Sequence, residues 1–163
     1  RECPTGVDMA RMKIEVLAAR AAKRGISLHD RLVGFLPRYA PFAARHPALF
    51  NRRDQSPAMR RASETFAGFS ARRSLPKWRA DIYRDRTDWS YASAKSDDPA
   101  RDVVLFADTF NRYFERENLD DALSVLTAGG YRVHAIRSKD GNARPLCCVR
   151  TFLSVGQVDQ AKQ

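Results

Sequence analysis

Two adjacent cysteines, Cys147 and Cys148, are the residues of this 163-residue chain with the clearest potential for chemistry. Neighbouring cysteines rarely bridge each other, because their side-chain geometry suits a disulfide poorly. Their two thiolates can instead bind one soft metal centre. The third cysteine, Cys3, lies near the start of the sequence, and an odd count without a secretion signal favours reduced thiols. The alternatives are a small buried side chain for Cys3 and two half-buried thiols in a turn for the pair.

A βαβ unit is expected to position the cysteine pair. The apolar run at 103–106 predicts a buried parallel strand, and residues 119–128 predict an amphipathic helix that Asn118 caps and Gly129 ends. Residues 131–136 predict a second strand. Strand, helix and strand within about 35 residues form a βαβ unit, which is usually right-handed. We therefore expect an α/β fold in this part of the chain.

Polar side chains are expected beside the cysteines at one edge of the sheet. Ligands of open parallel sheets bind beyond the carboxyl ends of the strands, which is where Asp108 follows the first strand. Cys147 and Cys148 follow a third extended segment, so the two regions are predicted to face one crevice. Arg150 adds a cation that can lower the pKa of a neighbouring thiol. We therefore predict that Asp108 and Arg150 line a site around the thiols.

Other catalytic patterns are absent from the sequence. It contains neither a glycine-rich phosphate-binding loop nor a serine nucleophile motif. Its three histidines, His29, His46 and His134, do not have metal-ligand spacing and are expected at the surface or partly buried. Acid–base chemistry on a substrate is therefore not expected from this chain.

Helices are expected in the first part of the chain. Residues 8–23 predict a helix that ends before Gly25. Met9, Met12 and Val16 recur in it at helical spacing, which predicts that the two methionines pack in the core.

A second helix is expected after Ser27, which is a capping residue, with Leu28, Leu32 and Phe35 on its buried face. Three prolines then predict short turns or one-turn helices: Pro37, Pro41 and Pro47.

Less regular segments are expected further along. A helix is predicted at 57–66, a linker at 85–100, a polar turn at 138–142 and another helix from Phe152 onward. Residues 68–78 fit no regular period and predict an extended segment that lies across another surface. Three side chains are expected to hold this segment: Phe69, Leu75 and Trp78.

The net charge of +10 is concentrated in the first 100 residues. These carry 20 basic and 11 acidic side chains (+9), whereas residues 101–163 carry 9 and 8 (+1). A basic surface can attract nucleic acid, anionic lipid or an acidic protein, and the alternative is an ordinary solvated surface rich in arginine. We expect no nucleic-acid partner, because no motif alternates aromatic and basic residues. A non-catalytic basic binding or subunit-docking module is the alternative function.

The ends of the sequence predict a fragment of a longer protein. The chain has no initiator methionine and no signal peptide, and it ends within a helical pattern. No apolar run approaches the ~18 residues of a membrane span, so no transmembrane segment is expected.

Three stretches resemble a known family. Residues 2–9 (Glu-Cys-Pro-Thr-Gly-Val-Asp-Met) resemble the end of a bacterial ferredoxin cysteine run, whose fourth cysteine ligates the other of two [4Fe–4S] clusters. Residues 104–114 and 144–156 resemble the cysteine-rich domain of heterodisulfide-reductase-like iron–sulfur oxidoreductases. Together they are similar to the C-terminal half of large bacterial FAD-linked oxidases, and the resemblance covers nearly the whole chain.

The resemblance implies an electron-transfer segment of an FAD- and [4Fe–4S]-dependent 2-hydroxyacid dehydrogenase, of the D-lactate, D-2-hydroxyglutarate or glycolate type. Cys3, Cys147 and Cys148 would be cluster ligands, with Asp108 and Arg150 tuning the site around them. A flavin domain of the same parent chain would bind FAD, and a quinone or another electron carrier would accept the electrons. A cytoplasmic location with peripheral contact at the inner membrane is expected.

The resemblance also implies three domains. The end of a helical ferredoxin-type domain would occupy residues 1–50, a basic extended linker 51–100, and the first part of a Rossmann-like cysteine-rich domain 101–163. The family motif reads Cys-Cys-Gly, and Val149 stands in the glycine position. A β-branched residue does not readily take a positive φ or let the backbone approach a ligand closely, so the departure from the motif bears on the geometry of the site.

Overall fold

The computed structural model describes residues 6–85, 99–136 and 146–162. Cys3, most of the linker predicted at 85–100 and the turn predicted at 138–142 lie outside the described residues. The described chain is mostly helical with one two-stranded parallel sheet, so the expected α/β class holds at this coarse level. The elements in chain order are α1 (Met9–Arg24), α2 (Leu28–Gly34), α3 (Leu36–Arg45), α4 (Pro47–Gln55), α5 (Pro57–Ala67), a 3₁₀ turn (Pro99–Arg101), β1 (Asp102–Leu105), α6 (Thr109–Tyr113), α7 (Arg116–Ala128), β2 (Arg132–Ala135), α8 (Arg150–Ser154) and α9 (Val158–Lys162).

Two compact units make up the chain, and each combines segments that are distant in the sequence. The first unit holds residues 1–39, 52–75 and 148–163, and the second holds 40–51 and 76–147. Helices α3 and α4 each contribute to both units, because the divisions fall inside them. The three-domain division implied by the resemblance stays a prediction.

Capping side chains define the first two helices, as the sequence predicted. Asp8 accepts a hydrogen bond from the backbone N–H of Arg11 at 3.0 Å, and α1 ends at Gly25 with a φ of 74°. Ser27 accepts a hydrogen bond from the backbone N–H of Asp30 at 3.1 Å and donates one to its carboxylate at 2.7 Å. Both helices begin where a short polar side chain can satisfy an otherwise unpaired N–H group.

The buried side of α1 is not the one that the sequence predicted. Met9, Met12 and Val16 are 64%, 50% and 67% exposed, so the core role expected for the methionines is wrong. The helix is apolar on two sides, and the covered side is the one that packs against the α8–α9 turn. A Cβ atom on Gly156 in that turn would lie 2.4 Å from the backbone carbonyl carbon of Leu17, which is half-buried.

Pro37 and Pro41 do not interrupt α3, contrary to the prediction, whereas Pro47 does lie at a break between two helices. Helix α3 continues through Pro41, and α4 begins at Pro47. Proline is tolerated in the first turn of a helix, which accounts for Pro37 and Pro47 but not for Pro41. Burial of one small-residue face stabilises α3 despite the hydrogen bond lost at Pro41: Ala40, Ala43 and Ala44. In α2 the predicted buried face is partly wrong, because Leu28 is 52% exposed.

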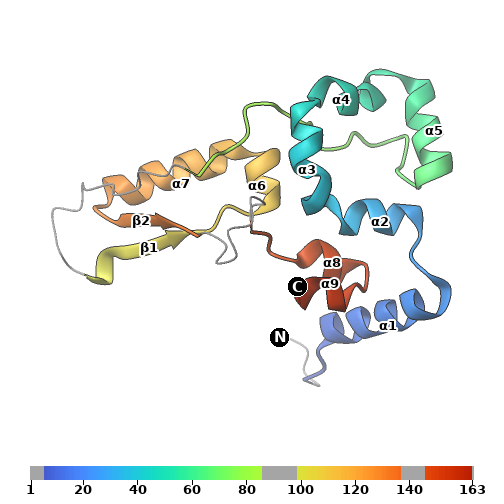
Figure 1. Cartoon of the computed structure of the whole chain (residues 1–163), viewed down its shortest axis with the longest axis horizontal. Helices are drawn as coiled ribbons and strands as arrows, with labels where there is room; N and C mark the ends of the chain where they lie inside the picture. The colour runs from blue at the N-terminus through green and yellow to red at the C-terminus, as the bar shows by residue number, and fades with distance from the viewer. Residues whose placement is uncertain (1–5, 86–98, 137–145, 163) are drawn as a thin grey trace. The chain divides into compact units, whose positions relative to one another are not determined.

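The core of the second unit is a parallel strand pair packed against α7 (Figure 1). Val103 of β1 lies opposite Val133 of β2, and Val133 is fully buried. Leu119 of α7, Tyr83 and Ala107 complete the buried cluster. The strand–helix–strand order and the parallel pairing were both predicted from the apolar pattern.

Local differences from the predicted elements occur on both sides of this core. The short helix α6 was not predicted, and α7 begins at Arg116, two residues before the expected cap Asn118. The helix expected from Phe152 onward is divided into α8 and α9, because Gly156 has a φ of 74° between them. Helix α5 agrees with its prediction.

An aromatic cluster forms a second hydrophobic contact region within the second unit. Trp78 lies 4.6 Å from Phe114 and 5.9 Å from Phe50 between ring centroids. The Asn51 side chain accepts from the Trp78 backbone N–H at 2.9 Å and donates to its carbonyl at 2.8 Å. Trp78 therefore holds the end of the extended segment, as predicted.

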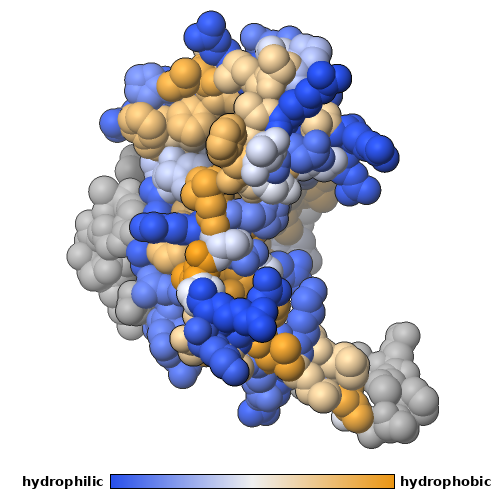
Figure 2. Space-filling view, turned by 90° about the vertical axis from the view of Figure 1, so that its right-hand side faces the viewer, coloured by the Kyte–Doolittle hydropathy of each residue, from blue (hydrophilic) through white to orange (hydrophobic). Residues whose placement is uncertain are grey.

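Hydrophobic residues (orange) are exposed between hydrophilic residues (blue) on the surface shown in Figure 2. Within the part of the chain that the structure describes, every helix is too short or too polar to span a lipid bilayer.

Candidate functional site

The cysteine pair lies just before a sharp turn into α8. Val149 precedes the helix with φ 51° and ψ 1°, in the left-handed region, and it is the one non-glycine residue with a positive φ in the described ranges. The backbone N–H of Phe152 donates to the Val149 carbonyl at 3.1 Å. Cys147 is half-buried, whereas Cys148 and Arg150 are exposed. The turn therefore presents the Cys148 thiol to solvent.

The positive φ of Val149 is an unfavourable conformation for a β-branched residue. The left-handed region costs a residue other than glycine about 1–2 kcal/mol. The residues that follow supply the constraint, because Thr151 and Phe152 are both 5% exposed. The Phe152 ring meets the Phe35 ring edge-on, with the centroids 5.2 Å apart. Burial of the Phe152 ring offsets the strain at Val149.

Asp108 lies at the carboxyl end of β1, as predicted, where it caps α6. Its carboxylate accepts hydrogen bonds from the backbone N–H groups of Phe110 at 2.8 Å and Asn111 at 3.3 Å. The Asn111 side-chain amide donates to the second carboxylate oxygen. Both carboxylate oxygens therefore accept hydrogen bonds from α6, and Asp108 fixes the start of that helix.

The described residues supply only part of a cluster site. A [4Fe–4S] cluster normally has four cysteine ligands. Cys147 and Cys148 offer two thiols, and Cys3 lies outside the described ranges. No group of three or more His, Cys, Asp and Glu side chains in the described segments is arranged to hold a metal ion. The segment around Cys148 therefore fits a partial ligand set and not a complete centre.

Arg53 is a buried anchor that sequence reasoning missed. It is 9% exposed, and its Nη2 donates to the carbonyls of Phe69 at 3.2 Å and Ser70 at 2.7 Å. Its Nη1 donates to the Arg73 carbonyl at 3.1 Å, and its Nε to the Ser63 hydroxyl at 2.6 Å. Arg53 thus holds the extended segment to α4 and α5 within the first unit. The sequence does not distinguish it from the exposed arginines around it.

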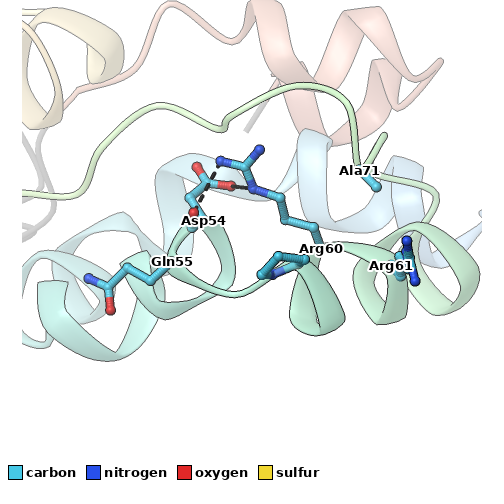
Figure 3. A pocket seen from close by; sticks show the side chains of 6 residues that line it. Asp54, Gln55, Arg60, Arg61 and Ala71 are labelled. Carbon is cyan, nitrogen blue, oxygen red and sulfur yellow. Dashed lines mark hydrogen bonds and ion pairs between the residues drawn. The ribbon is translucent and has the colours of Figure 1, made fainter.

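A cavity of about 360 Å³ lies beside this anchor, where α4 turns into α5 (Figure 3). The Arg60 side chain points toward Asp54, and its Nε lies 3.6 Å from the carboxylate. The Leu75 backbone N–H also donates to Asp54, at 2.8 Å. The charge of Asp54 is therefore used within the fold. The cavity is lined by Asp54, Gln55, Pro57, Arg60, Arg61 and Ala71.

A second buried arginine, Arg112, supports α6 in the second unit. It is 6% exposed, donates to the Tyr83 and Ala107 carbonyls at 3.2 and 3.4 Å, and pairs with Asp85 at 2.8 Å. Arg112 therefore ties the residues before the sheet to the helix that Asp108 caps.

An exposed ion-pair network joins the segment around residue 80 to α7. The Arg79 guanidinium lies 2.7 Å from the carboxylates of both Asp81 and Glu117. The hydrogen bond from Arg79 lowers the pKa of Asp81 to about 2, and it also lowers the pKa of Glu117.

The net charge is divided unequally between the two units. The first unit carries 16 basic and 7 acidic side chains (+9), and the second carries 13 and 12 (+1). Comparisons with protein families, with curated proteins and with solved structures find no match for this chain.

Proposed function

We propose that this chain is an electron-transfer segment of an FAD- and [4Fe–4S]-dependent 2-hydroxyacid dehydrogenase. The observation that carries the proposal is the left-handed backbone at Val149, directly after Cys147 and Cys148. The family that the sequence resembles has glycine at this position, and glycine takes a positive φ without strain. The chain therefore has the cysteine pair of the resembled motif and a turn that a glycine would favour, although the glycine itself is absent.

Each predicted residue has a separate role in this proposal. Cys147 and Cys148 would donate thiolates, and Cys3 would belong to a ferredoxin-type centre. Arg150, exposed at the start of α8, would place a positive charge near the thiol side of the turn. Asp108 would set the position of α6 by capping it. When bound, a [4Fe–4S] cluster supplies one-electron transfer, and the described residues would provide part of its ligand set.

The finer fold assignment belongs to the same proposal. Residues 1–50 would end a ferredoxin-type domain, and residues 101–163 would begin a Rossmann-like cysteine-rich domain after the linker 51–100. The parallel pairing of β1 and β2 supports the second assignment, since parallel strands joined by a helix are the unit of such sheets. The flavin domain of the parent chain and a quinone or electron-carrier acceptor are the proposed partners.

Anaerobic reconstitution of the intact parent protein with iron and sulfide tests the proposal. We expect bound iron and an EPR signal on reduction, and we expect Cys148→Ser to remove about four irons per chain, the content of one cluster. Arg150→Gln, two residues away, should retain the iron. An intact parent that binds no iron and gives no EPR signal would contradict the proposal.

A further inference from the structure

We propose that the exposed face of α1 binds the surface of an anionic phospholipid membrane. Met9, Met12 and Val16 occupy positions i, i+3 and i+7, so they form one stripe along the helix. Their exposed fractions of 64%, 50% and 67% place the whole stripe in solvent. The opposite side of α1 is already used within the first unit, where it meets the turn at Gly156. The helix therefore presents a second apolar side to a partner.

Positive charges flank this apolar stripe. Lys13 and Arg20 lie four and eleven residues after Met9, which places them beside it on a helix of 3.6 residues per turn. Lys23 lies seven residues after Val16, on the same side. All three cations are exposed. Together with Met9, Met12 and Val16 they define what we call the α1 face.

The acidic side chains at α1 do not lie on the α1 face. Asp8 caps the helix, and Glu15 pairs with Arg11 at 3.1 Å on a different side of it. The α1 face is therefore apolar and cationic, on a unit whose net charge is +9. Interfacial helices bind anionic lipid with this combination, because apolar side chains enter the headgroup region while Lys and Arg contact the phosphates.

The apolar stripe decides between anionic partners. A nucleic acid would need cations and aromatic stacking groups, and α1 contains no aromatic residue. Contact with two methionines and a valine would add little to the affinity for a nucleic acid. A lipid surface uses both parts of the α1 face. Such a contact requires neither iron nor flavin, so membrane binding and cluster binding can succeed or fail independently.

Cosedimentation with large unilamellar vesicles tests the α1 face in the full chain. The vesicles contain phosphatidylcholine alone or with one-third phosphatidylglycerol, at low and high salt. We expect the chain to bind the anionic vesicles at low salt. Binding should be weaker at high salt, and weaker to the vesicles of phosphatidylcholine alone. Replacing Lys13, Arg20 and Lys23 with Gln should weaken the partition constant about fivefold per cation, or roughly a hundredfold in total. Val16→Ser should also weaken binding.

Matched variants separate the α1 face from general attraction to a basic unit. Replacing Arg52, Arg61 and Arg72 with Gln removes the same charge from exposed positions elsewhere in the first unit. Phe66→Ser removes an apolar side chain that is 78% exposed on α5. Both controls should retain most of the binding, and circular dichroism checks that all variants keep their helices. The proposal is overturned if the wild type does not bind anionic vesicles at low salt. It is also overturned if the triple variant of the α1 face and the triple arginine control lose equal affinity.

Discussion

Val149 combines an unfavourable residue type with a left-handed backbone. We expect Val149→Gly to be more stable than Val149→Ala by about 1 kcal/mol, because both lose the half-buried side chain but only glycine is free of the positive-φ strain. Urea unfolding followed by circular dichroism measures the difference. Equal stability of the two variants would show that the turn relaxes without strain.

Arg53 is the buried cation with the largest set of contacts to one segment. Its removal leaves the Phe69, Ser70 and Arg73 carbonyls without their donor and takes a neighbouring charge from Asp54. We expect Arg53→Gln to destabilise the chain by about 2–4 kcal/mol in urea unfolding.

The adjacent residue on α4 gives the matched control for this prediction. Arg52 is exposed, so Arg52→Gln should change the stability by less than about 0.5 kcal/mol. If the two variants lose equal stability, the contacts of Arg53 do not hold the segment as described.

At the scale of the elements, Gly156 sets the contact between α1 and the α8–α9 turn. A Cβ there would lie 2.4–2.7 Å from backbone atoms of Leu17 and Ala18, and the φ of 74° adds strain. We expect Gly156→Ala to cost about 2–4 kcal/mol and to lower the hydrogen-exchange protection of α1. Gly68→Ala, with a φ of 70° but no neighbour closer than 3.5 Å, should cost only about 1 kcal/mol. Equal losses would exclude close packing as the cause.

The ion pairs of Arg79 join the segment around Asp81 to α7 and give a pH-dependent contribution. The hydrogen bond from Arg79 lowers the pKa of Asp81 from 3.8 to about 2 in the folded state. A carboxylate whose pKa is lower when folded stabilises the fold above the unfolded pKa, and this contribution is lost as the pH falls toward the folded pKa. The Tm difference between wild type and Asp81→Asn should therefore shrink between about pH 5 and pH 2.

The size of this effect is expected to be small, because the Asp81 and Glu117 side chains are 59% and 61% exposed. Asp121→Asn, which changes an exposed carboxylate of α7, is the matched control, and its Tm difference should stay constant over the same range. A constant difference for Asp81→Asn would contradict the prediction.

Local signals predicted the elements better than they predicted packing. The caps Asp8 and Ser27 act within one helical turn, so the sequence predicted where α1 and α2 begin. The choice between the two apolar sides of α1 depends on the turn at Gly156, which is more than 100 residues away, and the sequence pattern favoured the wrong side. Pro41 likewise stays helical because its neighbours on α3 are buried.

The candidate site was predictable in composition but not in conformation. Adjacent cysteines are visible in any reading of the sequence, and so is an aspartate after an apolar strand. The left-handed turn at Val149 depends on the burial of Phe152, and the hydrogen bonds of Asp108 depend on the unpredicted helix α6. Neither effect has a signature at the positions concerned.

At the scale of the whole molecule, we expect α3 and α4 to couple the unfolding of the two units, because each helix contributes residues to both. On α4, Asn51 holds the backbone of Trp78 in the second unit, and Arg53, two residues later, holds the extended segment of the first. Loss of α4 would release both sets of contacts. We therefore expect one cooperative unfolding transition.

Tryptophan fluorescence in a Trp89→Phe background, where Trp78 is the one remaining tryptophan, can test this coupling, because Trp78 belongs to the second unit. Arg53→Gln perturbs contacts of the first unit, so any shift of the fluorescence midpoint in urea reports transmission to the second. We expect the fluorescence and circular dichroism midpoints to fall together by the same amount, as they do in two-state unfolding. If the fluorescence midpoint stays at its wild-type value while the circular dichroism midpoint falls, the units unfold separately and the shared helices do not couple them.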